Sequence, residues 1–246
     1  MADGRWQMAG TESMRDIADK NIIIIGLTGS SGSGKSEAAR MLSGLGAHVI
    51  DADAVSHEIT DTREVLAELR EEFGDWVVGA HGGFDRALAS KKAFADSGFL
   101  KRLTGITHKY IIKEVYRRVA GMRDCISTRP AGDISIAAGV RPEGDTDSAA
   151  GVRGVIVIDA PLPVEKGFLD LADTVWVVSA PRSQRLERIM SRDGLSREAA
   201  GARLSSQLSD EGYERLADVI INNGGGIDEL RAAVTRNYEA LAAFDL

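Results

Sequence analysis

The residues with the clearest chemistry in this chain form a glycine-rich loop, GSSGSGKS, at positions 29–36. Its spacing matches the pattern G-x-x-x-x-G-K-[ST], in which successive backbone N–H groups turn inward and create an anion site. In such a loop Lys35 spans the β- and γ-phosphates and Ser36 places its hydroxyl on Mg²⁺. We therefore predict binding of a nucleoside triphosphate with Mg²⁺. The predicted contacts are Gly29, Gly32, Ser33, Gly34, Lys35, Ser36 and Glu37.

Several classes of protein share this loop, including kinases, GTPases, motor ATPases and sulfotransferases. The chain contains no N-K-x-D sequence of the kind that reads guanine, which weakens the GTPase alternative and favours ATP. The alternative is a glycine- and serine-rich turn that carries a lysine by chance. A buried strand before the loop and a helix after it supply the context that the motif requires.

Carboxylates directly follow two of the predicted strands. Asp51 and Asp53 come after a strand at 47–50, and on an extended chain they would project to one side, toward the phosphates. We predict Asp53 to be the general base that accepts the proton of an attacking hydroxyl, with Asp51 supporting it. Asp159 ends the apolar run 155–158, a pattern typical of an acid that holds Mg²⁺ through water. Helix capping by the first pair and simple solvation of Asp159 are the open alternatives.

Six arginines lie between positions 182 and 203, against three acidic residues, in a chain that is otherwise acidic. Helical spacing places Arg185, Arg188 and Arg192 on one face. This arrangement suits a lid that closes over the triphosphate and supplies positive charge during transfer, with Arg192 as the phosphate-binding residue. The alternative is a solvated helix with internal ion pairs. Asn223 follows the last strand and is predicted to contact the adenine, although a simple turn also explains it.

Strand and helix patterns alternate along the chain. The β-branched run at 22–27 predicts a strand buried on both faces, and further strands are expected at 47–50, 155–158, 174–178 and 219–221. Strands that alternate with helices indicate an α/β fold with a parallel sheet.

The long stretch between the second and third predicted strands is mainly helical, with helices expected at 63–73, 86–94 and 99–122. It is too long for a simple crossover and therefore predicts an inserted domain beside the nucleotide core. The predicted division is a polar N-terminal extension at 1–20, a nucleotide-binding core at 21–60 and 154–246 with a lid at about 182–206, a helical domain at 61–123, to which the family resemblance described below assigns acceptor binding, and a flexible inserted loop at 124–153.

The composition excludes several classes of protein. Of 246 residues, 43% are hydrophobic and 27% charged, which is typical of a soluble globular protein. The net charge of −7 opposes nucleic acid or an anionic membrane as partner. Cys125 is the only cysteine, so no intramolecular disulfide is possible. Because neither a signal peptide nor an apolar run of about 20 residues is present, we expect a cytoplasmic protein; the sequence does not give the oligomeric state.

The chain resembles the dephospho-CoA kinase family from about residue 22 to its last helix. Seven segments carry the resemblance in order: IGLTGSSGSGKS, GAHVIDAD, FDRALASKKAF, ITHKYI, VIVIDAPLPVEKG, RDGLSREAAGARLSSQ and LADVIINNGG. The resemblance implies a three-layer phosphate-loop kinase fold, with a five-stranded parallel sheet, a helical CoA-binding insertion and a lid.

The resemblance also implies an activity, the ATP- and Mg²⁺-dependent phosphorylation of the 3′-hydroxyl of dephospho-CoA, which is the final step of coenzyme A biosynthesis. The family's base then corresponds to Asp53 and its lid arginine to Arg192. Small-molecule ATP and dephospho-CoA are the implied partners. The expected acceptor-binding residues are Asp51, Asp53, Arg86, His108, Pro161 and Leu162.

The chain departs from the family pattern at several positions. Ser30 and Ser31 replace a glycine and an apolar residue, and Glu37 replaces a threonine or serine. Lys109 replaces a proline, and Pro163-Val164 replaces a Leu-Phe pair. The last two changes lie on the acceptor side, so a related kinase of another nucleoside-like acceptor is the alternative.

A non-catalytic ATP-binding regulatory protein is the third hypothesis, in which residues 124–153 would bind a partner. The presence of both Asp53 and Arg192 argues against it.

Overall fold

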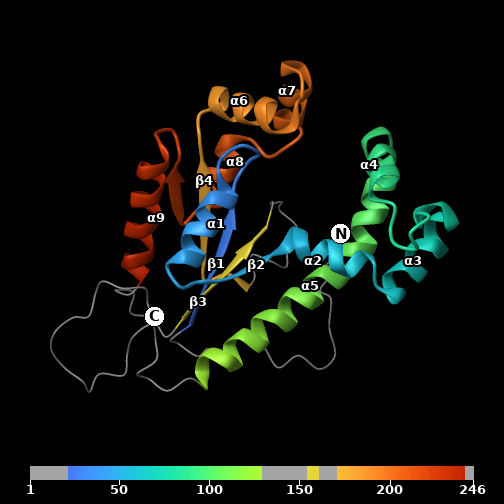
Figure 1. Cartoon of the computed structure of the whole chain (residues 1–246), viewed down its shortest axis with the longest axis horizontal. Helices are drawn as coiled ribbons and strands as arrows, with labels where there is room; N and C mark the ends of the chain where they lie inside the picture. Colours follow the sequence, from blue (N-terminus) through green and yellow to red (C-terminus); the bar gives the residue numbers. More distant parts are fainter. Residues whose placement is uncertain (1–21, 129–153, 161–170, 242–246) are drawn as a thin grey trace, which may run out of the picture.

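The computed structural model of the chain describes residues 22–128, 154–160 and 171–241. Five parallel strands form one sheet in the order β2-β3-β1-β4-β5 (Figure 1). The strands are β1 (Ile22–Thr28), β2 (His48–Asp51), β3 (Gly154–Asp159), β4 (Thr174–Ser179) and β5 (Val219–Asn222). The predicted α/β fold with a five-stranded parallel sheet is confirmed.

β1 lies at the centre of the sheet because all seven of its residues are buried and mainly β-branched. It pairs with β3 on one side and β4 on the other. Because the strands are parallel, their carboxyl ends meet at one edge, where Leu27 and Asp51 each lie opposite Asp159. In sheets of this type ligands bind outside that edge.

Helices cover both faces of the sheet and produce three layers. Ile23, Ile25 and Leu27 pack against α1 (Lys35–Gly44) and α9 (Ile227–Leu241). Ile22 and Ile24 point to the opposite face, toward α2 (Ala52–Thr60) and α5 (Ser97–Ser127), and α8 (Asp210–Glu214) packs beside β4. The alternation of β1 side chains between two apolar layers explains why this strand has no polar face.

A separate apolar core stands beside the sheet. It unites α3 (Arg63–Phe73), the 3₁₀ helix η1 (Asp75–Val77), α4 (Arg86–Ala95) and the first half of α5. Its buried members are Val65, Leu69, Val77, Phe84, Ala89 and Phe99. This core forms the helical domain, which Figure 1 shows to one side of the sheet, with α2 and α5 leading to it.

The helix α5 has 31 residues and belongs to both cores. It begins after Asp96, whose carboxylate accepts hydrogen bonds from the backbone N–H groups of Gly98 and Phe99. It continues to Ser127 because Ile126 is still buried against the sheet. The first four residues of the loop predicted at 124–153 are therefore helical, and its positions 129–153 lie outside the described residues, as does the extension at 1–20.

The segment predicted to be the lid contains two helices, α6 (Arg182–Asp193) and α7 (Arg197–Ser205). They turn at Gly194, which adopts left-handed backbone angles, and they share a small core of Ile189, Ala200 and Leu204. Within the described ranges, no helix combines the length and apolar character needed to cross a membrane.

Candidate active site

The loop at 29–36 joins the end of β1 to α1, as its motif requires. Gly32 and Gly34 have positive φ angles of 77° and 99°. A Cβ on Gly32 would lie 2.7 Å from the carbonyl oxygen of Arg185, and one on Gly34 would lie 2.2 Å from Nδ2 of Asn223. Glycine at these two positions lets the loop curl while neighbouring elements press directly on its backbone.

A cleft of about 530 Å³ opens over this loop. The base predicted at Asp53 and the lid arginine predicted at Arg192 both line it, although the chain separates them by more than a hundred residues. All seven predicted loop contacts line it as well. The further side chains on its wall are Ser30, Ser31, Arg40, Arg188, Arg203, Gln207 and Tyr213.

Lys35 and Asp159 contact each other at the carboxyl edge, where Lys35 Nζ donates a hydrogen bond to Oδ1 of Asp159. Asp159 is buried, and this burial raises the pKa of its carboxyl group. The ammonium of Lys35 opposes the increase in pKa, whereas the nearby carboxylates of Asp51 and Asp53 add to it. Three acids thus lie close together beside the phosphate loop.

This donor set fits Mg²⁺. Asp159 and Ser36 supply hard oxygen atoms, and the negative potential of the neighbouring acids attracts a cation. Among the described residues, no three His, Cys, Asp or Glu side chains form a complete metal cage. Magnesium needs no such cage, because it is commonly held by one or two protein oxygens together with substrate phosphates.

Asp51 and Asp53 have different local roles. β2 ends at Asp51, whose carboxylate caps α2 by accepting hydrogen bonds from the N–H groups of Asp53 (2.9 Å) and Ala54 (3.1 Å). Asp53 lies in the first turn of α2, so the prediction that both project from extended chain is wrong. Helix capping, the alternative role, therefore accounts for the position of Asp51. The carboxylate of Asp53 is exposed and lines the cleft.

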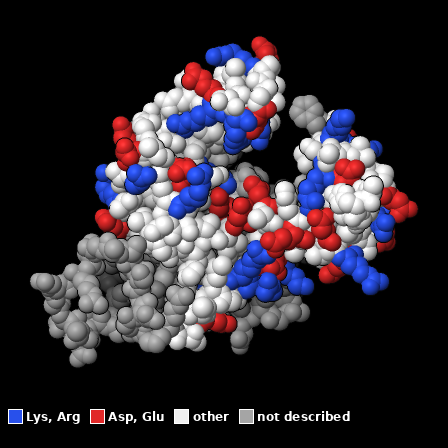
Figure 2. All heavy atoms as spheres, viewed as in Figure 1, with Lys and Arg blue, Asp and Glu red and all other residues white. Residues whose placement is uncertain are grey.

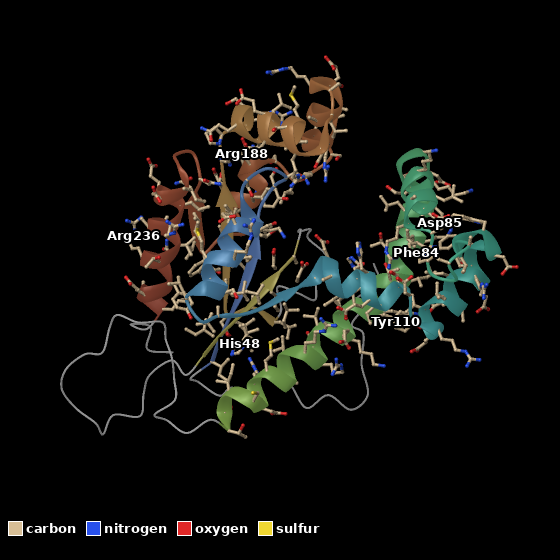
Figure 3. All side chains as sticks on the ribbon, in the orientation of Figure 1. His48, Phe84, Asp85, Tyr110, Arg188 and Arg236 are labelled. Atoms are coloured by element: carbon tan, nitrogen blue, oxygen red, sulfur yellow. The ribbon has the colours of Figure 1, made fainter. Side chains whose placement is uncertain are left out.

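The three arginines predicted on one face of α6 separate into two sets. Arg185 is buried and bonded to Ser30 and Asp210. Arg188 donates to the carbonyl oxygens of Gly32 and Asn223, both at 3.1 Å. Figure 3 shows Arg188 where α6 meets the phosphate loop. These two residues therefore fasten α6 to the loop and its surroundings.

Arg192, at the end of α6, belongs to a second set. Its Nε donates to Asp193 at 2.7 Å, and Arg203 of α7 donates to the same carboxylate at 2.8 Å. The hydrogen bond to Asp193 raises the pKa of Arg192, so its charge is secure. Asp193 thus gathers two guanidinium groups at the wall of the cleft, and Arg203 is a candidate phosphate ligand that the sequence analysis missed.

Asn223 lies beneath the loop. Its Nδ2 donates to the carbonyl oxygen of Ser33 at 2.7 Å, and the residue is buried. This contact supports the shape of the loop, and contact with adenine stays a prediction. Glu37 lines the cleft and pairs with Arg40 on α1.

On the acceptor side, Arg86 donates to the carbonyl oxygen of His57 and to Thr60 and Asp61 at the end of α2. It anchors the start of α4. His108 lies half-buried on α5. Pro161 and Leu162 lie outside the described residues, as does Pro163-Val164. Their roles in binding the acceptor stay predictions.

Lys109, which motivates the alternative acceptor, is engaged within the helical domain. Its Nζ pairs with Glu68 at 2.5 Å, and the Tyr110 hydroxyl donates to the same carboxylate at 2.8 Å. This hydrogen bond to Glu68 raises the pKa of Tyr110 to about 12. Figure 3 places Tyr110 and Phe84 in the helical domain, well apart from Arg188. Lys109 therefore has a local structural partner in Glu68.

The space between the two sides is open in Figure 2. The lid and the sheet lie on one side of the hollow and the helical domain on the other, and acidic side chains gather over α2 between them. Asp53, which lines the cleft over the phosphate loop, belongs to this helix.

Comparisons with known proteins agree with this geometry. The profile of the family described as dephospho-CoA kinase matches residues 23–128 and 146–229. The dephospho-CoA kinase of Thermobifida fusca is 35% identical over 218 residues, which cover 88% of this chain and 95% of that protein. That of Symbiobacterium thermophilum is 36% identical over 88% of this chain and 80% of its own length.

Solved structures agree as well. A crystal structure from Thermus thermophilus superposes with a TM-score of 0.66 at 28% identity, covering 90% of this chain and 98% of the other. The Campylobacter jejuni dephospho-CoA kinase has the same fold, with a TM-score of 0.55 at 24% identity over 91% of this chain and 98% of its own. A sequence profile, close relatives and a shared fold over nearly the whole chain thus agree: the chain belongs to the dephospho-CoA kinase family.

Proposed function

We propose that this protein transfers the γ-phosphoryl group of ATP to the 3′-hydroxyl of dephospho-CoA. The observation that carries the proposal is that Lys35, Asp53 and Arg192 line one cleft over the phosphate loop. A phosphate ligand, a free carboxylate and a lid cation are the parts that phosphoryl transfer to an alcohol requires.

Each of these residues has a proposed role. Lys35 and Arg192 stabilise the charge of the transferred group, and Asp53 accepts the proton of the attacking hydroxyl. Ser36 and Asp159 would hold Mg²⁺, which neutralises phosphate charge when it is bound. Catalysis then consists mainly of positioning and electrostatic stabilisation.

The helical domain is the proposed acceptor side. Arg86 and His108 belong to it, and the family resemblance extends the site to Pro161 and Leu162. Binding of dephospho-CoA across the hollow would bring its 3′-hydroxyl to Asp53, which lies between the helical domain and the loop. We also propose that the nucleotide-binding core, the lid and the helical domain are separate functional parts, and that the protein is cytoplasmic.

A coupled assay for ADP formation tests this function. We expect dephospho-CoA to raise the rate far above that with ATP alone, and adenosine and other nucleosides to give no such increase. Faster turnover of another nucleoside would favour the related-kinase alternative, and no turnover with any acceptor would contradict the proposal.

Asp53→Asn separates catalysis from nucleotide binding. We expect kcat to fall about 10²- to 10⁴-fold, the usual contribution of a general base, while the Kd for ADP stays near the wild-type value. Asp228→Asn is the matched control because Asp228 is an exposed acid on α9 that does not line the cleft, and it should keep full activity. Unchanged kcat in Asp53→Asn would remove Asp53 from the mechanism.

A further inference from the structure

Two of the serines of the phosphate loop, Ser30 and Ser31, bind the segment through which the lid returns to the sheet. Ser30 Oγ donates to Oε1 of Gln207 at 3.0 Å, and the Ser31 backbone N–H donates to the same oxygen at 2.9 Å. Nε2 of Gln207 donates back to Ser31 Oγ at 2.9 Å. One amide side chain therefore holds both serines from about 176 positions away in sequence.

Arg185 extends this network from the other side. Its NH1 donates to Ser30 Oγ at 2.7 Å, and its NH2 donates to both carboxylate oxygens of Asp210, at 2.7 and 2.6 Å. Only 4% of the Arg185 side chain is exposed, and the Asp210 carboxylate compensates the buried positive charge. The Ser30 hydroxyl accepts from Arg185 and donates to Gln207, which fixes its orientation.

The positions of Gln207 and Asp210 show which segments the network joins. Gln207 lies in the short connection between the end of α7 and the start of α8, and Asp210 is the first residue of α8. This connection is one of the two attachments of the lid to the sheet. The other attachment is the start of α6, whose backbone at Arg185 lies directly against Gly32. Both ends of the lid therefore contact the phosphate loop.

We propose that Gln207 and Arg185 are positioning residues that lock the phosphate loop to the base of the lid, so that nucleotide binding and lid position are coupled. Ser30 and Ser31 are the loop's half of this lock. They occupy the positions where the sequence departs from the family pattern, and hydroxyl groups there have a defined partner. The inference deepens the proposed function, but it concerns the nucleotide side alone.

A double-mutant cycle on ADP binding tests the lock. Ser31→Ala and Gln207→Met each remove the contact between the two side chains. Ser31→Ala should raise the Kd for Mg-ADP about fivefold, the equivalent of one hydrogen bond. Gln207→Met also removes the bonds from Ser30 Oγ and the Ser31 N–H, so it should raise the Kd by at least the same factor. The double variant should bind Mg-ADP about as tightly as the weaker-binding of the two single variants, because both changes break the same contact. Isothermal titration calorimetry measures these constants without any acceptor.

Two control variants distinguish loss of the Ser31 hydroxyl from a general effect of substitution in this region. Ser31→Thr keeps the hydroxyl and should restore the wild-type Kd, whereas Ser206→Ala removes a neighbouring hydroxyl that donates only to the Arg203 carbonyl and should leave Kd within about twofold. If Gln207→Met does not fold, the comparison of Ser31→Ala with Ser31→Thr still decides the outcome.

Hydrogen exchange gives a second readout that simple destabilisation would not produce. In Gln207→Met, the amides of 29–36 and 206–210 should exchange faster together, while those of β1 stay protected. An unchanged Kd in both single variants, or effects that multiply in the double variant, would overturn the proposal. Lack of dephospho-CoA turnover by the wild type would refute the proposed function and leave the ADP measurements valid.

Discussion

Lys35 and Asp159 are both largely buried, with 15% and 9% of their side chains exposed, so each offsets the cost of burying the other's charge. Lys35, the proposed phosphate ligand, thus forms an ion pair with an acid that is a candidate metal ligand. Removing one member leaves an uncompensated buried charge, whereas removing both leaves none. The pair therefore affects stability and binding in separable ways.

Lys35→Met should lower the free energy of unfolding by about 1–3 kcal/mol and weaken ADP binding more than tenfold. Adding Asp159→Asn should restore most of the lost stability without restoring binding, because the phosphate ligand is still missing. Urea unfolding and calorimetry measure the two quantities. Equal recovery of stability and affinity in the double variant would refute this separation.

Arg192→Gln tests the lid at one side chain. We expect kcat to fall about 10²- to 10³-fold, as for loss of a donor to a developing negative charge, with a smaller change in the Kd for ADP. Arg197→Gln is the control because Arg197 starts α7 on the exposed surface and does not line the cleft. If both variants keep full kcat, Arg192 does not act on the transferred group.

Residues next to strand ends were predictable from sequence, but those held by distant partners were not. Asp53 and Asp159 follow apolar runs, and the rule that ligands bind at the carboxyl edge identifies them. Arg185 has the same helical spacing as Arg192, yet its guanidinium is buried against Ser30 and Asp210. No periodicity encodes a contact between Ser31 and Gln207, so that network appears only in three dimensions.

Among the elements, α5 connects the two apolar cores. Because its two halves belong to different cores, substitutions in α5 can destabilise one core or the other. Phe99 packs with Phe73 and Trp76 in the helical domain, with ring centroids 4.7 and 5.7 Å apart, whereas Val119 packs against the sheet. The boundaries of α5 were only partly predicted, because the polar residues after Met122 conceal the burial of Ile126. Regular strands were easier to recognise, since each is a nearly continuous apolar run.

Phe99→Leu should lower the free energy of unfolding of the helical domain by about 1–2 kcal/mol. It should also raise the KM for dephospho-CoA several-fold, while the Kd for ADP stays unchanged. Val119→Ala, the control in the other half of the same helix, should instead lower the midpoint of global unfolding. Steady-state kinetics and thermal melts distinguish the two. A rise in the Kd for ADP in Phe99→Leu would show that the cores are not separable.

Acid should weaken the junction between α2 and α5. Glu114 accepts hydrogen bonds from Arg117 and Arg118, and these, the one from Arg117 above all, lower its pKa to about 2. Arg118 also pairs with Glu58 of α2. A lowered pKa in the folded state adds stability above the unfolded value of 4.5, and this stability is lost as the pH falls from 4.5 toward 2.

Glu114→Gln should therefore reduce the free energy of unfolding by about 1 kcal/mol at pH 7, with the difference from wild type disappearing toward pH 2. Urea unfolding across this range measures it. Glu71→Gln, at an exposed position on α3, should differ little from wild type at any pH. A difference for Glu114→Gln that grows on acidification would contradict the assignment.

At the level of the whole molecule, the lid and the helical domain face each other across the hollow, and α2 lies between them. The sequence predicted both parts as separate helical segments, but not their placement, since that depends on α5 crossing beneath the sheet. Phosphoryl transfer in an open hollow would expose the reacting group to water. Approach of the two sides would exclude water and bring both substrates to Asp53.

We therefore expect the distance between the lid and the helical domain to shorten when both substrates bind. Spin labels can be attached at Lys91→Cys on α4 and Arg197→Cys on α7, both exposed positions, in a Cys125→Ser background. Double electron–electron resonance spectroscopy then measures the distance between the labels. A non-hydrolysable ATP analogue with dephospho-CoA should shift the distribution to shorter values, and either ligand alone should shift it less. Labels at Ser43 on α1 and Arg215 after α8, within the sheet domain, should show no change. An unchanged distribution with both ligands would mean that the hollow does not close, and that water is excluded by the substrates themselves.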